Sequence, residues 1–369
     1  MAARWWIGIV ASLALTACHP AATRAAVAPC AGDLDPPRLP AADAPPLKIS
    51  YFGVSTLAFS AGDDEILIDG FFSRPGPIST AATRIGPRED VIARRLGQMP
   101  GRRLLAIFVA HAHHDHGLDA GKITEIVEHP PSGRLPTDPW VVGTRSAANL
   151  AEANGAKRAC AATNKGTYAV GPFRVTALEV PHGPASSWLE RKLRGETPPG
   201  RKLPAYFTDL KDTTNFSYLV EYGDRRILVY PSAGMAKDPP PPPAAAEVVF
   251  FGVGGLTADP DGHPDYPARY WAHISQSPTT GTYVPVHWDN FSIKLESRPG
   301  FPPAFLDDVP KALDQIEKRP RADRICFLEP LTRLTLPAHG ALAPIRSGSP
   351  RTPLKTRPAC QGGEGIASS

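Results

Sequence analysis

Short apolar runs separated by turn residues follow one another through the middle of the chain. A run of strand length bounded by glycine, proline or aspartate predicts a β-strand, and a run with helical spacing predicts a helix. We therefore expect strands within residues 47–72, 103–111, 139–144, 168–182, 214–230, 246–253 and 281–287. Helical segments are expected near residues 145–154, 266–276 and 303–317. The alternation of the two element types predicts an α/β fold.

Chemically reactive side chains stand where several of these predicted strands end. They are Asp69, His111, His182, Ser232 and His287. Because α/β proteins place their sites at the strand ends along one sheet edge, we expect these distant segments to meet in one site.

The composition divides the chain into a central domain and two terminal segments. The 369 residues, 42% of them hydrophobic, are enough for a large core. Residues 18–47 and 337–369 are rich in small residues and proline and have few large apolar residues. This composition predicts an extended tether and a flexible C-terminal tail. One domain is expected between them, at residues 48–336, with proline-rich surface insertions at 192–206 and 237–246.

Residues 1–17 have the layout of a secretory signal peptide. Arg4 precedes an apolar run from Trp5 to Leu15, which is too short to span a membrane as a stable helix. The sequence LTAC that ends at Cys18 resembles the lipobox of bacterial lipoproteins, in which cleavage is coupled to acylation of the cysteine. The resemblance implies an exported protein with a lipid anchor on the periplasmic side of a membrane, and His19 favours the outer membrane. An ordinary signal peptide with a chance cysteine is the alternative.

The remaining four cysteines indicate disulfide bonds. An oxidising compartment would allow up to two disulfides, with three possible pairings that spacing does not distinguish, among Cys30, Cys160, Cys326 and Cys360. Buried free thiols are the alternative. No pair has C-x-x-C spacing, so a thiolate zinc site is not expected.

The charge of the chain limits its partners. The formal net charge is +4, and no long block of lysine or arginine is present. Nucleic acid is therefore not an expected partner. A small-molecule or lipid-like substrate is expected, together with a membrane reached through the lipid anchor.

The sequence HAHHDH, residues 111–116, holds four of the eleven histidines in the chain. Imidazole nitrogens and carboxylate oxygens are the ligands that suit zinc and similar divalent ions. A turn that follows a strand can direct alternate side chains at one point. The cluster therefore predicts a metal site completed by residues from elsewhere in the chain.

The H-x-H-x-D-H pattern resembles the signature of the metallo-β-lactamase superfamily. Matching features follow in order: Asp69 ends the strand before the motif, His182 closes a later strand in LEVPHG, and His287 follows the strand in VPVHWDNF. The resemblance covers roughly residues 48–335. It implies a four-layer αββα sandwich, in which two mixed β-sheets are flanked by helices.

The resemblance also implies two divalent metal ions, zinc above all, each with three protein ligands. One ion would be bound by His111, His113 and His182, and the other by Asp115, His116 and His287. Asp69 would orient a ligand histidine from outside the ligand set. His114 would fill the variable position of the motif. Two alternatives stay open: His182 could be an ordinary loop histidine, and His263 or His273 could replace His287.

Ser232 marks a departure from the superfamily pattern. Most two-metal hydrolases of the superfamily have a bridging aspartate where this chain has YPSAG. Since serine is a poor bridging ligand, the second metal site is expected to be weaker. The sequences around Phe52, Asp69 and His287 look like the branch that contains an ascorbate-phosphate lactonase and the N-acyl phosphatidylethanolamine phospholipase D.

The resemblance implies a hydrolase that cleaves an ester, lactone or phosphodiester bond with a water activated by the metals. Asp115 and His116 would be the catalytic residues, with Asp115 orienting the water and relaying its proton. Tyr230, His263 and Trp288 are candidates for substrate binding. Two alternatives are a periplasmic β-lactam hydrolase and a catalytically degenerate metal-binding lipoprotein.

Overall fold

The computed structural model describes residues 25–34, 38, 40–236, 245–258, 263–276, 281–342, 347–348, 359–360 and 362–366. The expected signal peptide and Cys18 lie outside these residues, as does most of the 237–246 insertion. No helix within the described ranges has the length and apolar character needed to cross a membrane.

The first sheet is mixed and has eight strands in the order β16-β13-β1-β2-β3-β4-β5-β6. In chain order these are β1 (Leu47–Tyr51), β2 (Leu57–Ala61), β3 (Asp64–Ile68), β4 (Arg103–Val109), β5 (Trp140–Gly143), β6 (Arg158–Ala161), β13 (Thr332–Leu336) and β16 (Glu364–Gly365). Strands β3 to β6 run parallel, and the other pairs are antiparallel. Every residue of β2 and β3 is buried, which is expected for strands covered on both faces.

The second sheet is also mixed and has six strands in the order β12-β11-β10-β9-β8-β7. They are β7 (Thr167–Val170), β8 (Phe173–Val180), β9 (Asn215–Tyr222), β10 (Arg225–Tyr230), β11 (Val248–Gly252) and β12 (Thr282–Val286). Strands β7 to β10 are antiparallel, and β10 to β12 are parallel. Hence β8, β10 and β12 point the same way, and their carboxyl ends lie at one edge. A separate pair is formed by β14 (Ser347–Gly348) and β15 (Ala359–Cys360).

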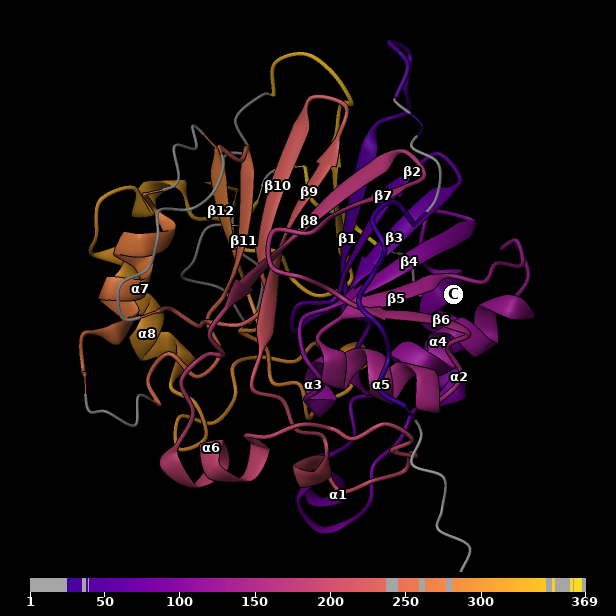
Figure 1. Ribbon diagram of the computed structural model, residues 1–369. Helices are drawn as coiled ribbons and strands as arrows, with labels where there is room; N and C mark the ends of the chain where they lie inside the picture. The colour runs from indigo at the N-terminus through magenta and orange to yellow at the C-terminus, as the bar shows by residue number, and fades with distance from the viewer. Residues whose placement is uncertain are drawn as a thin grey trace, which may run out of the picture.

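Helices cover the outer faces of the two sheets (Figure 1). The first sheet is covered by α2 (Glu89–Gly97), α4 (Ala120–Glu128) and α5 (Arg145–Ala153), and the second by α7 (Tyr266–Ile274) and α8 (Val309–Glu317). The main core fills the space between the sheets and continues under α7 and α8, and a second cluster joins α2, α4 and α5 to the first sheet. The predicted four-layer αββα sandwich is confirmed.

Shorter helices lie in the connections. They are α1 (Pro77–Ala82), α3 (His114–Gly117), α6 (Ser187–Leu193), η1 (Phe207–Asp209), η2 (Leu295–Ser297) and η3 (Ala322–Arg324). Figure 1 shows α1 and α6 below the carboxyl ends of the strands.

Two disulfide bonds attach the terminal segments to the domain. Cys30 is bonded to Cys160 in β6, and Cys326 to Cys360 in β15. The backbone N–H of Val27 also donates to the side chain of Asn149, at 2.8 Å, and β16 pairs with β13. The described parts of the expected tether and tail are therefore held against the domain, which corrects the picture of free segments. Hydrogen bonds and disulfides hold them, so they need few apolar residues.

Candidate metal centre

Three connections, after β4, β8 and β12, bring the candidate ligands to one edge of the sandwich. His111 and His113 lie in the turn after β4, and the short helix α3 presents Asp115 and His116. His182 lies two residues after β8, and His287 directly follows β12. The structure thus assembles side chains that are up to 176 positions apart, from His111 to His287, into two adjacent groups.

The first group consists of His111, His113 and His182. The Nε2 atom of His182 lies 3.1 Å from Nε2 of His111 and 3.1 Å from Nδ1 of His113. Two nitrogens that each lie 2.0–2.1 Å from a tetrahedral zinc ion are about 3.3 Å apart. The three ring nitrogens are therefore spaced as ligands of one ion.

A carbonyl oxygen accepts a hydrogen bond from the outer nitrogen of each histidine in this group. Nδ1 of His111 lies 3.1 Å from Oδ1 of Asn215, and Nε2 of His113 lies 3.3 Å from the Leu193 carbonyl. Nδ1 of His182 lies 2.7 Å from the Gly183 carbonyl. Because a carbonyl can only accept, each outer nitrogen carries the proton and each inner nitrogen presents its lone pair.

Burial keeps these three imidazoles neutral. It is the main reason that the pKa values of His111 and His113 lie well below the usual histidine value, and neighbouring histidines add to the effect. Burial also lowers the pKa of His182 to about 4. Three neutral rings with converging lone pairs are a good donor set for zinc and a poor arrangement without a cation.

The second group consists of Asp115, His116 and His287. Oδ2 of Asp115 lies 3.1 Å from Nε2 of His287 and 3.7 Å from Nε2 of His116. The rings of His111 and His116 have centroids 4.2 Å apart, so the two groups are neighbours. One carboxylate and two imidazoles form a donor set that fits a divalent ion. The residues present therefore fit two metal ions side by side.

Asp69 orients His116, as the sequence predicts for an outer carboxylate. Its Oδ2 lies 2.8 Å from Nδ1 of His116 and accepts a hydrogen bond from Ser55, while its Oδ1 accepts from the Ala110 N–H at 2.8 Å. Burial lowers the pKa of His116, but the carboxylates of Asp69 and Asp115 outweigh it and raise the pKa above its usual value. The bond to Asp69 leaves Nε2 of His116 directed at Asp115.

Three non-glycine residues around this centre have positive φ angles. They are Val54 at 49°, Asp69 at 59° and His287 at 58°. For a β-branched residue such as Val54 this conformation is strained. The Val54 carbonyl accepts the His287 N–H at 2.6 Å, so the strained turn fixes the backbone of a candidate ligand.

Asn215, at the start of β9, is a functional candidate that the sequence does not reveal. Replacing it with alanine removes the acceptor for Nδ1 of His111. We expect one metal ion to bind about 10- to 100-fold more weakly, because loss of such outer partners has that effect. Competition with a chelator measures the change. Asn164→Ala is the control, since its Oδ1 accepts only the Glu179 N–H on the surface and should leave metal affinity unchanged.

Ser232 lies next to the loop that carries His182. Its hydroxyl oxygen accepts the Gly183 N–H at 2.9 Å and so supports the loop that carries His182. The only carboxylate in the two candidate ligand groups of the described residues is that of Asp115, so neither group contains a counterpart of the bridging aspartate. Ser232 therefore helps to position the candidate ligand His182.

Two of the three candidate substrate residues are closed to a substrate. Tyr230 is 3% exposed and Trp288 is fully buried, both within the main hydrophobic core, so neither side chain is accessible to a substrate. His263 is exposed and, like His273, belongs to neither ligand group. Closeness to a strand end in sequence does not fix which way a side chain points, and this corrects the expectation for Tyr230 and Trp288.

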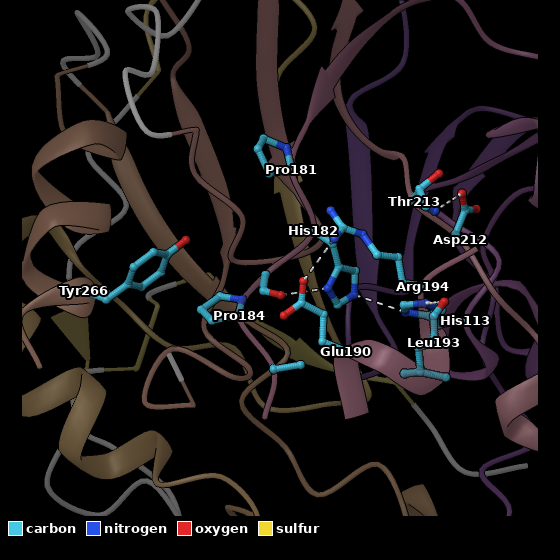
Figure 2. A pocket seen from close by; sticks show the side chains of 12 residues that line it. His113, Pro181, His182, Pro184, Glu190, Leu193, Arg194, Asp212, Thr213 and Tyr266 are labelled. Carbon is cyan, nitrogen blue, oxygen red and sulfur yellow. Dashed lines mark hydrogen bonds and ion pairs between the residues drawn. The ribbon is translucent and has the colours of Figure 1, made fainter. Parts of the chain in front are cut away.

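A pocket opens beside the first group. Its wall includes His113, His182, Thr213, and Glu190 and Arg194 from the end of α6. Figure 2 shows the His182 ring between Glu190 and His113, with Arg194 close by. The Arg194 and Glu190 side chains are 4.0 Å apart, and the former is 72% exposed. Arg194 therefore offers a weakly paired cation near the centre.

Asp119 holds the loop that follows Asp69 and is expected to make stability depend on pH. It accepts hydrogen bonds from Phe72 and Ser73, and burial raises its pKa to about 6 from 3.8. The pKa of this carboxyl is higher in the folded protein than in the unfolded chain. It therefore stabilises the folded protein fully below the unfolded pKa of 3.8, and this stabilisation is lost as the pH rises through about 6. The change is about 3 kcal/mol.

Asp119→Asn should remove this contribution. In the metal-free protein, the difference in unfolding free energy between wild type and variant should shift by about that amount between pH 4 and pH 7, in favour of wild type at the lower pH. Urea unfolding at both pH values measures it. A difference that is the same at both would contradict the raised pKa.

The fold and the site together define an αββα sandwich with two metal-ligand groups at its strand ends. Comparison of the sequence with models of protein families finds no match, and neither does comparison with curated proteins.

Solved structures with a similar fold do exist. The metallo-beta-lactamase fold protein YhfI from Bacillus subtilis is 16% identical, with a TM-score of 0.43 over 83% of this chain and 96% of that one. The metallo hydrolase Igni18 from Ignicoccus hospitalis is 15% identical, with a TM-score of 0.45 over 79% and 98%. Zn(2+)-bound PqqB from Methylobacterium extorquens is 15% identical, with a TM-score of 0.42 over 76% and 86%. These likenesses concern the fold alone.

Proposed function

We propose that the protein is a metal-dependent hydrolase of the metallo-β-lactamase superfamily with two zinc ions. The observation that carries the proposal is the pair of adjacent ligand groups, one of which has all three histidine tautomers fixed by carbonyl acceptors. His111, His113 and His182 would hold one ion, and Asp115, His116 and His287 the other. When bound, such ions polarise the bond under attack and acidify water.

The residues around the centre would orient the reactants. Burial raises the pKa of Asp115, but the neighbouring histidines outweigh it and lower the pKa well below its usual value. Asp115 therefore stays ionised and can accept a hydrogen bond from an attacking water. Arg194, at the pocket wall, is placed to bind an anionic group of the substrate. We propose an ester, lactone or phosphodiester as the bond that is cleaved, and the Arg194 cation favours a substrate that carries an anionic group.

We also propose that the protein is exported and anchored through a lipid on Cys18. The two disulfide bonds support export, because disulfides persist in an oxidising compartment.

Metal content tests the function first. A form of the chain that starts at residue 19 would be purified without chelator and analysed by elemental mass spectrometry. About two zinc ions per chain, with turnover in a panel of lactones, esters, phosphodiesters and β-lactams, is the expected result. One ion would indicate a weak second site. Two ions without turnover of any substrate would favour a degenerate metal-binding protein, and no metal after reconstitution would reject the proposal.

A further inference from the structure

The exposed large apolar side chains of the described residues are confined to three connections. These connections follow β3, β8 and β12, the strands that lead into Asp69, His182 and His287. The side chains and their exposed fractions are Ile78 (80%), Trp188 (54%), Tyr206 (47%), Ile293 (38%), Phe305 (86%) and Leu306 (65%). We call this set the apolar rim. The apolar rim is thus confined to connections that lead from the candidate metal centre and is not spread over the whole described surface.

The segments that carry the apolar rim touch one another around the centre. The connection after β3 meets the one after β8, because Ile85 and Ala205 exchange backbone hydrogen bonds and the Arg84 guanidinium stacks 5.6 Å over the Tyr206 ring. The His114 ring contacts both Phe207 and Phe291, which joins the connection after β8 to the one after β12. Exposed apolar side chains on touching segments mark an interaction surface.

The residue types of the apolar rim suit a lipid surface. Helix α6 carries the exposed Trp188 and is followed by Arg194, and it also exposes Arg191 and Lys192. Tryptophan and aliphatic side chains enter the boundary between headgroups and acyl chains, while arginine and lysine bind lipid phosphates.

The N-terminal part of the described chain lies against α5, which in turn contacts the connection after β8. Val27 bonds to the Asn149 side chain, whose Nδ2 donates to the carbonyl of Thr197 in the connection after β8. Ala25 is only seven positions after Cys18, a distance of at most about 25 Å for extended chain. An anchor at Cys18 would therefore keep this side of the domain close to a membrane.

We propose that the apolar rim docks on the surface of a phospholipid bilayer, so that the pocket beside His182 opens toward the membrane. The docking uses only surface side chains, and it is independent of the metal ions and of the proposed hydrolysis.

Binding to vesicles tests the proposal with a chain that starts at residue 19, which contains every described residue and has no lipid. It should sediment with phosphatidylcholine vesicles, and more strongly when they also contain phosphatidylglycerol, with or without chelator. The tryptophan fluorescence should shift to shorter wavelength on binding. Trp271 and Trp288 are buried, and Trp140 lies in β5 under the Arg158 guanidinium, outside the apolar rim, so the shift should be absent in the Trp188→Ser variant. The double variant Phe305→Ser, Leu306→Ser and the single variant Trp188→Ser should each lower the partition coefficient by at least about tenfold.

The controls separate a lipid from other occupants of the apolar rim. Lys157→Ser, on an exposed residue beside β6, should bind vesicles like wild type. Circular dichroism checks that the rim variants fold, as expected for exposed positions. Failure of the wild type to bind either kind of vesicle would overturn the proposal. So would self-association that the rim variants abolish, because the surface would then bind a second copy of the chain.

Discussion

Replacing His116 with alanine is expected to leave about one metal ion per chain and to slow hydrolysis by at least about a thousandfold. The variant removes one of three ligand atoms of the second group, next to Oδ2 of Asp115. A metal ion contributes several kcal/mol to stabilising the charge that develops in the reaction, and each 1.36 kcal/mol is a factor of ten in rate. Elemental analysis and the rate on a substrate found by screening measure the two effects.

His129→Ala is the matched control for this experiment. His129 is exposed at the end of α4 and belongs to neither ligand group, so metal content and rate should stay at wild-type values. Asp69 keeps its hydrogen bonds from Ser55 and Ala110 in the His116 variant, which favours a folded protein. A His116→Ala protein that retains two ions and full activity would show that the second group is not the catalytic metal site.

The two ligand groups could be predicted from the sequence because each candidate has a local signal. Four histidines in six positions are themselves unusual, and His182 and His287 each follow an apolar strand at its end. Strands that point the same way in a sheet end at the same edge, so strand ends far apart in sequence are brought together by the fold.

The partners of those ligands could not be predicted in the same way. The acceptors for the first group are an asparagine at the start of β9 and two backbone carbonyls, at Leu193 and Gly183. A carbonyl exists at every residue, so only the folded backbone shows which one faces a histidine. Tyr230 illustrates the related error, because it lies at a strand end yet its side chain is buried in the hydrophobic core.

The strands of the sandwich were easier to predict than the helices on the first sheet. Helices α2 and α4 do not appear among the expected elements, although both pack on that sheet. Helix α2 has two acidic residues in its first turn and two arginines in its last turn, so its apolar stripe is narrow. Their stability comes from packing against the sheet rather than from a strong local pattern.

Arg74 and Asp289 form a buried salt bridge that gives the candidate metal centre a second support. The two side chains are 1% and 0% exposed and form a salt bridge, and Oδ1 of Asp289 also accepts the Val54 N–H at 2.7 Å. The Val54 carbonyl in turn accepts the N–H of His287. The pair therefore holds the strained turn that fixes a candidate ligand, although the sequence gives neither residue a role.

Arg74→Met is expected to lower the free energy of unfolding by about 3–5 kcal/mol, because it leaves the Asp289 carboxylate buried without its cation. The double variant Arg74→Met, Asp289→Asn should be less destabilised, since it removes the orphaned charge and keeps an acceptor for Val54. Urea unfolding in the presence of chelator measures both without a contribution from bound metal.

The exposed pair of Arg88 and Asp90 provides the comparison for this prediction. Its side chains are 40% and 68% exposed and lie 3.4 Å apart, so Arg88→Met should cost less than about 1 kcal/mol. The metal-loaded Arg74→Met protein should also bind its second ion more weakly, because the turn that presents His287 is loosened. Equal stability of the Arg74 and Arg88 variants would mean that the buried pair contributes no more than a surface one, and the strained turn at Val54 would then need another support.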